Sequence, residues 1–384
     1  MKYKIMALAC LGILFLSISP YFVAAQSIED MPPARNSSPI VYDSESDRVV
    51  LFGGWKAQMT EEAYNDTWSY DANTNTWTEM TSDPAPGRRA CHALTYDEES
   101  DRIIMFSGGK SGEGTTLENW NDTWAYDLNT DTWTNMNPPT MPAPRLGAWM
   151  AYDSESDVCI LFGGIRDGGA FHGDTWAYDY NSNNWTNMNP SNAPSSRVAP
   201  MAYDSESDRI ILFAGGGFET WPLVMYTDTW AYDYNTNTWT EMNPAENPSS
   251  TGDLVYDEES DRVIMFGGTL DWDETELVSE TWAYDFNTNT WTEMTPSLAP
   301  SQRARPFMTY DSESDLSFLY SGGWLVDSES YNIINDLWTY DYNADTWKKI
   351  TPLDVFDPVI IVIGIGVVVV VIIIALVFIR RKQT

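Results

Sequence analysis

Among the residues that could carry out acid–base or metal chemistry, histidine and cysteine are rare, whereas carboxylates are abundant. The chain has two histidines, His92 and His172, and three cysteines, but 56 aspartates and glutamates. The histidines lie far apart, and no spacing typical of a zinc site is present. A Ser–His–Asp triad is recognised by geometry, so spacing alone proposes none. The sequence therefore predicts no metal centre and no catalytic set.

Alternating carboxylates form a short polar segment that recurs along the chain, first as Asp43, Glu45 and Asp47. Carboxylates on a loop suit calcium, but the glycine and terminal glutamate of an EF-hand loop are missing. An arginine such as Arg48 follows several of these segments and could neutralise them. Solvated turns are the main interpretation, no cofactor is predicted, and Ca²⁺ is kept as an alternative.

Five arginines stand six or seven residues before a recurring Tyr-Asp pair: Arg35, Arg89, Arg145, Arg197 and Arg303. The fifth occurrence of the pair has Ser249 instead. Guanidinium groups gathered in an acidic protein could bind an anion. Equally, they could form salt bridges with neighbouring loops, and both interpretations stay open.

Aromatic residues stand out in segments that differ from one another along the chain. They are Trp55, Trp120, Phe171, Phe218, Trp221, Trp272, Trp324 and Tyr331. Exposed aromatic rings suit sugar stacking or the anchoring of a protein partner. The alternative is that several of them pack locally. Together with the five arginines, they are the predicted ligand-binding residues.

All of these residues belong to a unit that is repeated six times. The stretch "YDSESDRVVLFGG", which begins at Tyr42, returns at intervals of 51 to 56 residues. A second stretch, "NDTWSYDANTNTWTEM" in the first unit, follows it each time. A fixed period of this length indicates a repeat architecture.

Each unit predicts four short strands. The segment ending in the tyrosine is strand one, the polar residues after it form a turn, and "RVVLF" is a second strand that is apolar on both faces. "TWSYD" and "WTEM" supply strands three and four, joined by a turn of Asn and Thr. A sheet this small cannot bury two apolar faces alone, so six sheets are expected to stack around an axis.

At this point the sequence resembles the kelch repeat family, whose marks are a double glycine after an apolar strand, then tryptophan and tyrosine on strand three and tryptophan on strand four. The first two units show them as Gly53, Gly54, Trp68, Tyr70, Trp77, Gly108, Gly109, Trp124, Tyr126 and Trp133. The resemblance implies an all-β, six-bladed propeller over residues 26–350. Its units span about residues 36–80, 89–136, 145–188, 197–242, 249–294 and 303–350. Ring closure needs no exchanged strand, though residues 26–33 could lend a short one.

The two faces of such a ring differ in sequence. Turns between strands one and two and between strands three and four share one face, here called the constant face because their sequences repeat. Connections between strands two and three, and from strand four to the next unit, share the other, here called the variable face. Binding residues usually lie on variable loops.

Some proteins similar to kelch propellers are enzymes, and galactose oxidase is the natural comparison. Its copper site requires two histidines and two tyrosines, one of them crosslinked to a cysteine. In this chain Cys91 lies beside His92, but the second histidine is in another unit and another class of loop. The prediction is therefore no enzyme, with a hydrolase or oxidase acting in the central channel as the alternative.

The two ends predict membrane anchoring. Residues 1–25 have two lysines, an apolar stretch and a small-residue exit, as in a secretory signal peptide. Residues 359–379 are wholly apolar and would rise about 31 Å as a helix, enough to cross a bilayer. Basic residues follow, which favours a cytoplasmic tail at 380–384 after a linker at 351–358. The expected topology is single-pass type I with an extracellular propeller and its variable face close to the lipid.

The net charge limits the class of partner, and the cysteine content limits the number of disulfides. The formal net charge of −35 argues against nucleic acid. After signal removal only Cys91 and Cys159 remain, and they could form a disulfide in an exported protein. Because they lie in different units on β-type segments, two buried free thiols are the main interpretation. The predicted function is a monomeric cell-surface module that binds a protein or a glycan.

Overall fold

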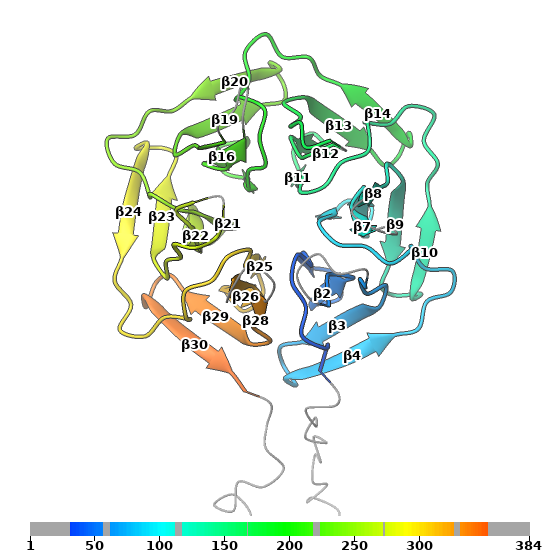
Figure 1. The fold of residues 1–384 in the computed structure, drawn as a ribbon, viewed down its shortest axis with the longest axis horizontal. Helices are drawn as coiled ribbons and strands as arrows, with labels where there is room; N and C mark the ends of the chain where they lie inside the picture. The colour runs from blue at the N-terminus through cyan, green and yellow to red at the C-terminus, as the bar shows by residue number, and fades with distance from the viewer. Residues whose placement is uncertain are drawn as a thin grey trace, which may run out of the picture. The chain divides into compact units, whose positions relative to one another are not determined.

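The computed structural model describes residues 31–56, 62–111, 117–166, 168–217, 223–271, 273–325 and 331–351. Within them the chain forms six antiparallel four-stranded sheets, the blades, arranged around a common axis (Figure 1). The predicted all-β, six-bladed propeller is confirmed.

The first three blades follow the sequence in order. Blade one consists of β1 (Ile40–Asp43), β2 (Arg48–Phe52), β3 (Thr67–Asp71) and β4 (Thr76–Met80). Blade two consists of β5 (Ala93–Asp97), β6 (Arg102–Phe106), β9 (Thr123–Asp127) and β10 (Thr132–Asn135). Blade three consists of β11 (Trp149–Asp153), β12 (Val158–Phe162), β13 (Thr175–Asp179) and β14 (Asn184–Asn187).

The other three blades have the same order. Blade four consists of β15 (Met201–Asp204), β16 (Arg209–Phe213), β19 (Thr229–Asp233) and β20 (Thr238–Glu241). Blade five consists of β21 (Thr251–Asp257), β22 (Arg262–Thr269), β23 (Thr281–Asp285) and β24 (Thr290–Met294). Blade six consists of β25 (Phe307–Asp311), β26 (Leu316–Tyr320), β29 (Leu337–Asp341) and β30 (Thr346–Ile350).

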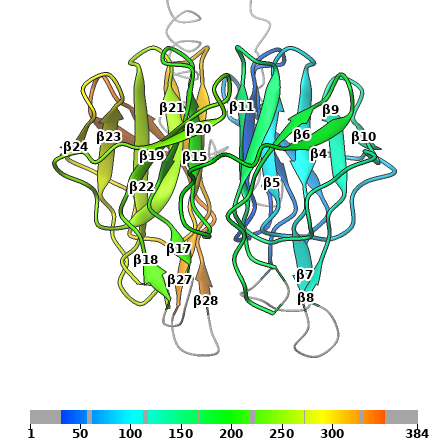
Figure 2. The same cartoon turned by 90° about the horizontal axis from the view of Figure 1, so that it is seen from above.

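Three further hairpins extend the connections between strands two and three. They are β7 (Gly109–Ser111) with β8 (Leu117–Asn119), β17 (Gly216–Gly217) with β18 (Val224–Met225), and β27 (Gly323–Leu325) with β28 (Tyr331–Ile333). All three project from the same face of the ring, the variable face (Figure 2). The sequence predicted variable loops here and missed the hairpins.

The apolar residues of the repeat are buried between neighbouring blades. On β2, Val49 and Leu51 pack toward blade six, and Val50 and Phe52 pack toward blade two. Among the described residues, each of the six gaps between blades holds one such cluster. Each blade thus covers an apolar face of the next, which is why an isolated unit would leave both faces in water.

The paired glycines hold one unit against the next. Gly53 and Gly54 have φ values of +62° and +101°, which side chains rarely tolerate. A Cβ on Gly53 would lie 2.5 Å from the Arg89 carbonyl oxygen of the second unit. The Gly54 amide donates a hydrogen bond of 2.8 Å to that same oxygen. The double glycine is therefore needed for close approach between neighbouring units.

Ring closure joins blade six to blade one without strand exchange, since each sheet takes its four strands from one unit. Asn335 Nδ2 donates to the Pro32 carbonyl oxygen at 3.0 Å, and Asn75 Nδ2 donates to the Thr351 carbonyl oxygen at 2.9 Å. The sequence allowed residues 26–33 to add a short strand to a blade. Residues 31–33 form no strand, and residues 26–30 lie outside the described ranges.

The predicted signal peptide and membrane helix, residues 1–25 and 359–379, also fall outside the described ranges. In the part of the chain that is described, no helix has the length and apolar character needed to cross a membrane.

Candidate functional site

The five recurring arginines are buried, each at 0 or 1% exposure. Every one pairs with an aspartate on the connection between strands two and three of its own unit. The pairs are Arg35–Asp66, Arg89–Asp122, Arg145–Asp174 and Arg303–Asp336, each at 2.7 Å, and Arg197–Asp228. Burial alone would raise the pKa of the Asp66, Asp122, Asp174 and Asp336 carboxyls, but the guanidinium beside each of the four holds its pKa below the usual value.

Each arginine also bonds to the backbone where its blade's second strand ends. Arg145 Nη1 donates to the Gly163 carbonyl oxygen at 2.8 Å, and Arg145 Nε donates to the Ala143 carbonyl oxygen at 3.1 Å. Among the described residues, an aromatic ring lies over the guanidinium groups of Arg35, Arg89 and Arg197, as with Trp120 over Arg89 at 4.5 Å. The salt-bridge interpretation thus describes the geometry, and binding of an anion by these arginines stays a prediction.

The fifth unit departs from this arrangement. The spacing placed Ser249 at the arginine position, but strand pairing puts Ser250 there, and its hydroxyl donates to the Gly267 carbonyl oxygen at 2.9 Å as Arg145 does to that of Gly163. Glu280 stands at the aspartate position. Arginine and aspartate therefore occur together in five units and are both absent from the fifth unit. Because the arginine and the aspartate are missing from the same unit, the sequence alone could have indicated that they form a pair.

The predicted aromatic residues occupy different environments on the variable face. Trp55 is 1% exposed and packs on Ala63 and Ala90, so it belongs to a small core cluster. Trp120, Phe171 and Trp324 are half-buried. The remaining members of the set are Phe218, Trp221 and Trp272, which lie outside the described ranges, and Tyr331, whose side chain does as well.

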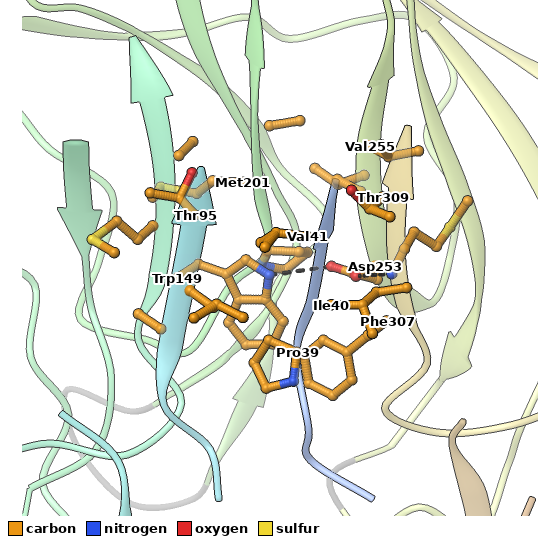
Figure 3. A pocket seen from close by; sticks show the side chains of 18 of the residues that line it. Pro39, Ile40, Val41, Thr95, Trp149, Met201, Asp253, Val255, Phe307 and Thr309 are labelled. Atoms are coloured by element: carbon orange, nitrogen blue, oxygen red, sulfur yellow. Dashed lines mark hydrogen bonds between the residues drawn. The ribbon is translucent and has the colours of Figure 1, made fainter. Parts of the chain in front are cut away.

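A cavity of about 570 Å³ runs along the central channel. Its lining comes from the first strand of every blade and reaches from Ser44 at the constant face to Arg305 at the variable face. Figure 3 shows Trp149 of blade three extending across the channel toward Asp253 of blade five. The Trp149 indole Nε1 donates to Asp253 Oδ1 at 3.1 Å, and the Met308 amide donates to Asp253 Oδ2 at 2.7 Å.

Arg305 and Glu274 form an ion pair at the variable-face end of this cavity. Arg305 Nε lies 2.6 Å from Glu274 Oε1, and Arg305 Nη1 is 3.5 Å from the Ser37 hydroxyl. Cys91 is partly exposed and lines the same end. These residues and the Trp149–Asp253 contact were not among the predicted site residues. The sequence signal was Asp253 itself, because the other units carry apolar residues at its position.

The histidines do not gather into a catalytic set in the structure. His92 is buried against the Phe52 ring, with ring centroids 5.6 Å apart, and burial together with Arg89 lowers its pKa to about 3. His172 lies in the next unit, with Nδ1 at 3.8 Å from Asp174 Oδ1. Cys91 and Cys159 are both unpaired thiols.

The recurring acidic segments form hydrogen-bonded turns on the constant face. Asp43 Oδ1 accepts the Ser46 amide at 2.9 Å, and Tyr42 donates to Asp47 Oδ1 at 3.0 Å. Arg48 pairs with Asp71 at the end of strand three, at 2.9 Å. Across the described ranges, no three His, Cys, Asp or Glu side chains are grouped to hold a metal ion. Calcium binding remains an untested alternative.

Comparison with known proteins agrees with this architecture. Residues 22–215 match the family model described as the KLHDC2/KLHL20/DRC7 Kelch-repeats domain. The chain is 25% identical to Kelch domain-containing protein 3 of Rattus norvegicus over 285 residues, 69% of this chain and 71% of the relative. It is 23% identical to Mei4-dependent protein 6 of Schizosaccharomyces pombe over 164 residues, 40% of this chain. The second match spans only 23% of that relative's own length.

Proposed function

Because the chain belongs to the kelch-repeat family, we propose that its propeller is a protein-interaction module that binds its partner through the variable face. The observation that carries this proposal is the division between repeated and unrepeated residues. The repeated residues are used in blade contacts, whereas the residues that differ between units collect on one face, from which three hairpins project.

The half-buried aromatics on that face are suitable anchors for a partner. Trp120 and Trp324 each present part of a large ring, and tryptophan is enriched among residues that dominate binding energy. A glycan is the second class of ligand that such rings can stack against.

The proposal places the module at the cell surface, anchored by residues 359–379 with the propeller outside. Its support is the sequence alone: an apolar stretch of membrane-spanning length followed by basic residues, and a leader of the secretory type. Partners are therefore expected among extracellular or membrane proteins and surface glycans.

Partner capture by the full-length chain tests the proposal. Trp324→Ala should weaken capture about tenfold, with the melting temperature changed by less than about 3 °C. Tyr342→Ala is the matched control, because it removes a half-buried aromatic from the same blade on the constant face. Equal partner capture by the unaltered chain, Trp324→Ala and Tyr342→Ala would reject the variable face as the binding surface. Weaker capture by Tyr342→Ala alone would reject it as well.

A further inference from the structure

The channel contains a buried carboxyl that the repeat does not require. Three residues before the recurring tyrosine, five units carry nonpolar or aromatic residues: Pro39, Ala93, Trp149, Pro200 and Phe307. The fifth unit carries Asp253 at this position. Since the same strand forms in the other five blades without a carboxyl there, blade formation does not explain this residue.

Burial makes Asp253 energetically unfavourable as an anion. Its exposure is 4%, and burial raises its pKa to about 7, even though the Met308 amide and the Trp149 indole donate to it. A buried charge is normally paired with an opposite charge. Among the described residues no basic side chain pairs with Asp253, and Arg305, which lines the same cavity, pairs with Glu274.

This arrangement differs from that of the protein's other buried acids. The turn aspartates such as Asp43 accept backbone amides within a repeated turn, and the variable-face aspartates such as Asp174 pair with an arginine. Asp253 instead lies in a cavity, where a group from outside the chain can supply the missing positive charge.

The surroundings of Asp253 are mainly aromatic and apolar. The Trp149 and Phe307 rings are nearly parallel, with centroids 6.0 Å apart and an interplanar angle of 15°. Pro39, Val41 and Met201 also line the cavity, together with the polar residues Thr95 and Thr309 (Figure 3). A cavity of about 570 Å³ is within the range that holds small organic molecules.

We propose that the channel binds a small organic cation, a primary amine on an aromatic body, with its ammonium on Asp253 and its ring against Trp149 and Phe307. An ammonium satisfies a carboxylate by charge-assisted hydrogen bonds, and aromatic faces attract cations. A carboxylate offers about four acceptor positions, so the contacts from the Trp149 indole and the amides of Met308 and Leu254 leave room for one further donor. This site is separate from the variable-face partner surface, and either can fail without the other.

Three probes with the same aromatic body and different charge test the proposal on the unaltered full-length chain: phenethylamine, phenethyl alcohol and phenylpropionate. Titration calorimetry or saturation-transfer NMR should show saturable binding of the amine. The neutral alcohol should bind at least about tenfold more weakly, since it lacks the charged partner, and the anion should not bind. Equal affinity for amine and alcohol, or no saturable binding of the amine, would overturn the proposal without any variant being made.

Two variants then locate the site. Asp253→Asn should weaken amine binding about tenfold and leave the alcohol unchanged. Glu258→Gln is the matched control, because it removes one exposed carboxylate from the rim of the same cavity and tests general attraction to this acidic chain. Amine affinity that falls with Glu258→Gln, or that survives Asp253→Asn in a folded protein, would contradict the assignment.

Discussion

Arg145 shows how one side chain secures a unit of the ring. Its guanidinium is 0% exposed, pairs with Asp174 at 2.7 Å and donates to two backbone carbonyl oxygens. If Arg145 is removed, Asp174 loses its cation and keeps the hydrogen bond from the Trp176 indole at 2.7 Å, while the two carbonyl oxygens each lose a donor. The loss of a partner by a buried polar group costs stability. The repeated arginines therefore stabilise the connections that carry the variable face.

Arg145→Ala should lower the free energy of unfolding by about 3–5 kcal/mol, because it leaves a partly buried aspartate without its cation. Arg209→Ala, which breaks the more exposed pair with Asp233, is the control and should change it by less than about 1 kcal/mol. Denaturant unfolding of the full chain measures both. Similar values for the two variants would contradict the structural role given to the buried pair.

Asp253 predicts a particular dependence of stability on pH. Its pKa is 3.8 when exposed and about 7 when folded, so the folded state holds a proton that the unfolded state has lost between these values. Stability from this group is therefore present at low pH and is lost as pH rises toward 7, at up to about 1.4 kcal/mol per pH unit. The groups that contact it are the Trp149 indole and the amides of Met308 and Leu254. The charged pair at the cavity end is Arg305–Glu274.

Asp253→Asn removes this titration, so the variant should gain stability relative to the unaltered chain as pH rises from 5 to 8. The measurement is the difference in free energy of unfolding between the two proteins across that range. A difference that does not change with pH would show that Asp253 ionises normally in the folded protein.

At the scale of strands, each blade is attached to the one before it by a buried hydrogen bond. Trp239 on strand four of blade four donates from Nε1 to the Thr175 hydroxyl on strand three of blade three, at 2.9 Å. Four other pairs repeat this contact between consecutive blades. At the closure seam Leu337 takes the threonine position. The Trp77 and Tyr320 rings, with centroids 5.5 Å apart, repeat there the contact that Trp133 and Phe52 make between blades two and one.

Thr175→Val keeps the side-chain shape but removes the acceptor for Trp239, so it should destabilise the fold by about 1–3 kcal/mol. Thr186→Val, on the exposed face of a neighbouring strand, should change stability by less than about 0.5 kcal/mol. Thermal or denaturant unfolding compares the two. If the buried substitution is as mild as the exposed one, the Trp–Thr contact does not hold the blades together.

The strands could be predicted because six copies of one pattern reinforce each other. An apolar second strand such as "RVVLF" and the Trp-Tyr third strand appear in every unit, so the blades and their order follow from repetition. The hairpins such as β7 and β8 were missed because their segments share no pattern between units. The same reason hid the Trp149–Asp253 contact, which joins blades three and five and has no counterpart elsewhere.

At the scale of the whole molecule, the ring closes through contacts between the first and last units rather than by exchange of a strand. The sequence predicted this closure from the completeness of each unit. It also predicted two ends that would place the propeller outside the cell, and these predictions rest on composition alone. Closure of the ring and the membrane topology of the two ends are therefore tested by different measurements.

Deleting residues 359–384 should release the protein from membranes, because it removes the predicted anchor and the basic residues that follow it. Fractionation of cells that make the full-length and truncated chains measures this, with alkaline extraction to remove peripheral proteins. Full-length chain found in the soluble fraction would contradict the anchor.

The central functional claim is that partners bind the variable face. Its most direct test places a photo-crosslinking residue at Glu118 on the β8 hairpin, and in a second protein at Asn129 in a turn of the constant face, both exposed and both in blade two. In cells that produce the protein, crosslinked partner should form from position 118 and be absent or much weaker from position 129. Crosslinking mainly from position 129 would contradict the account.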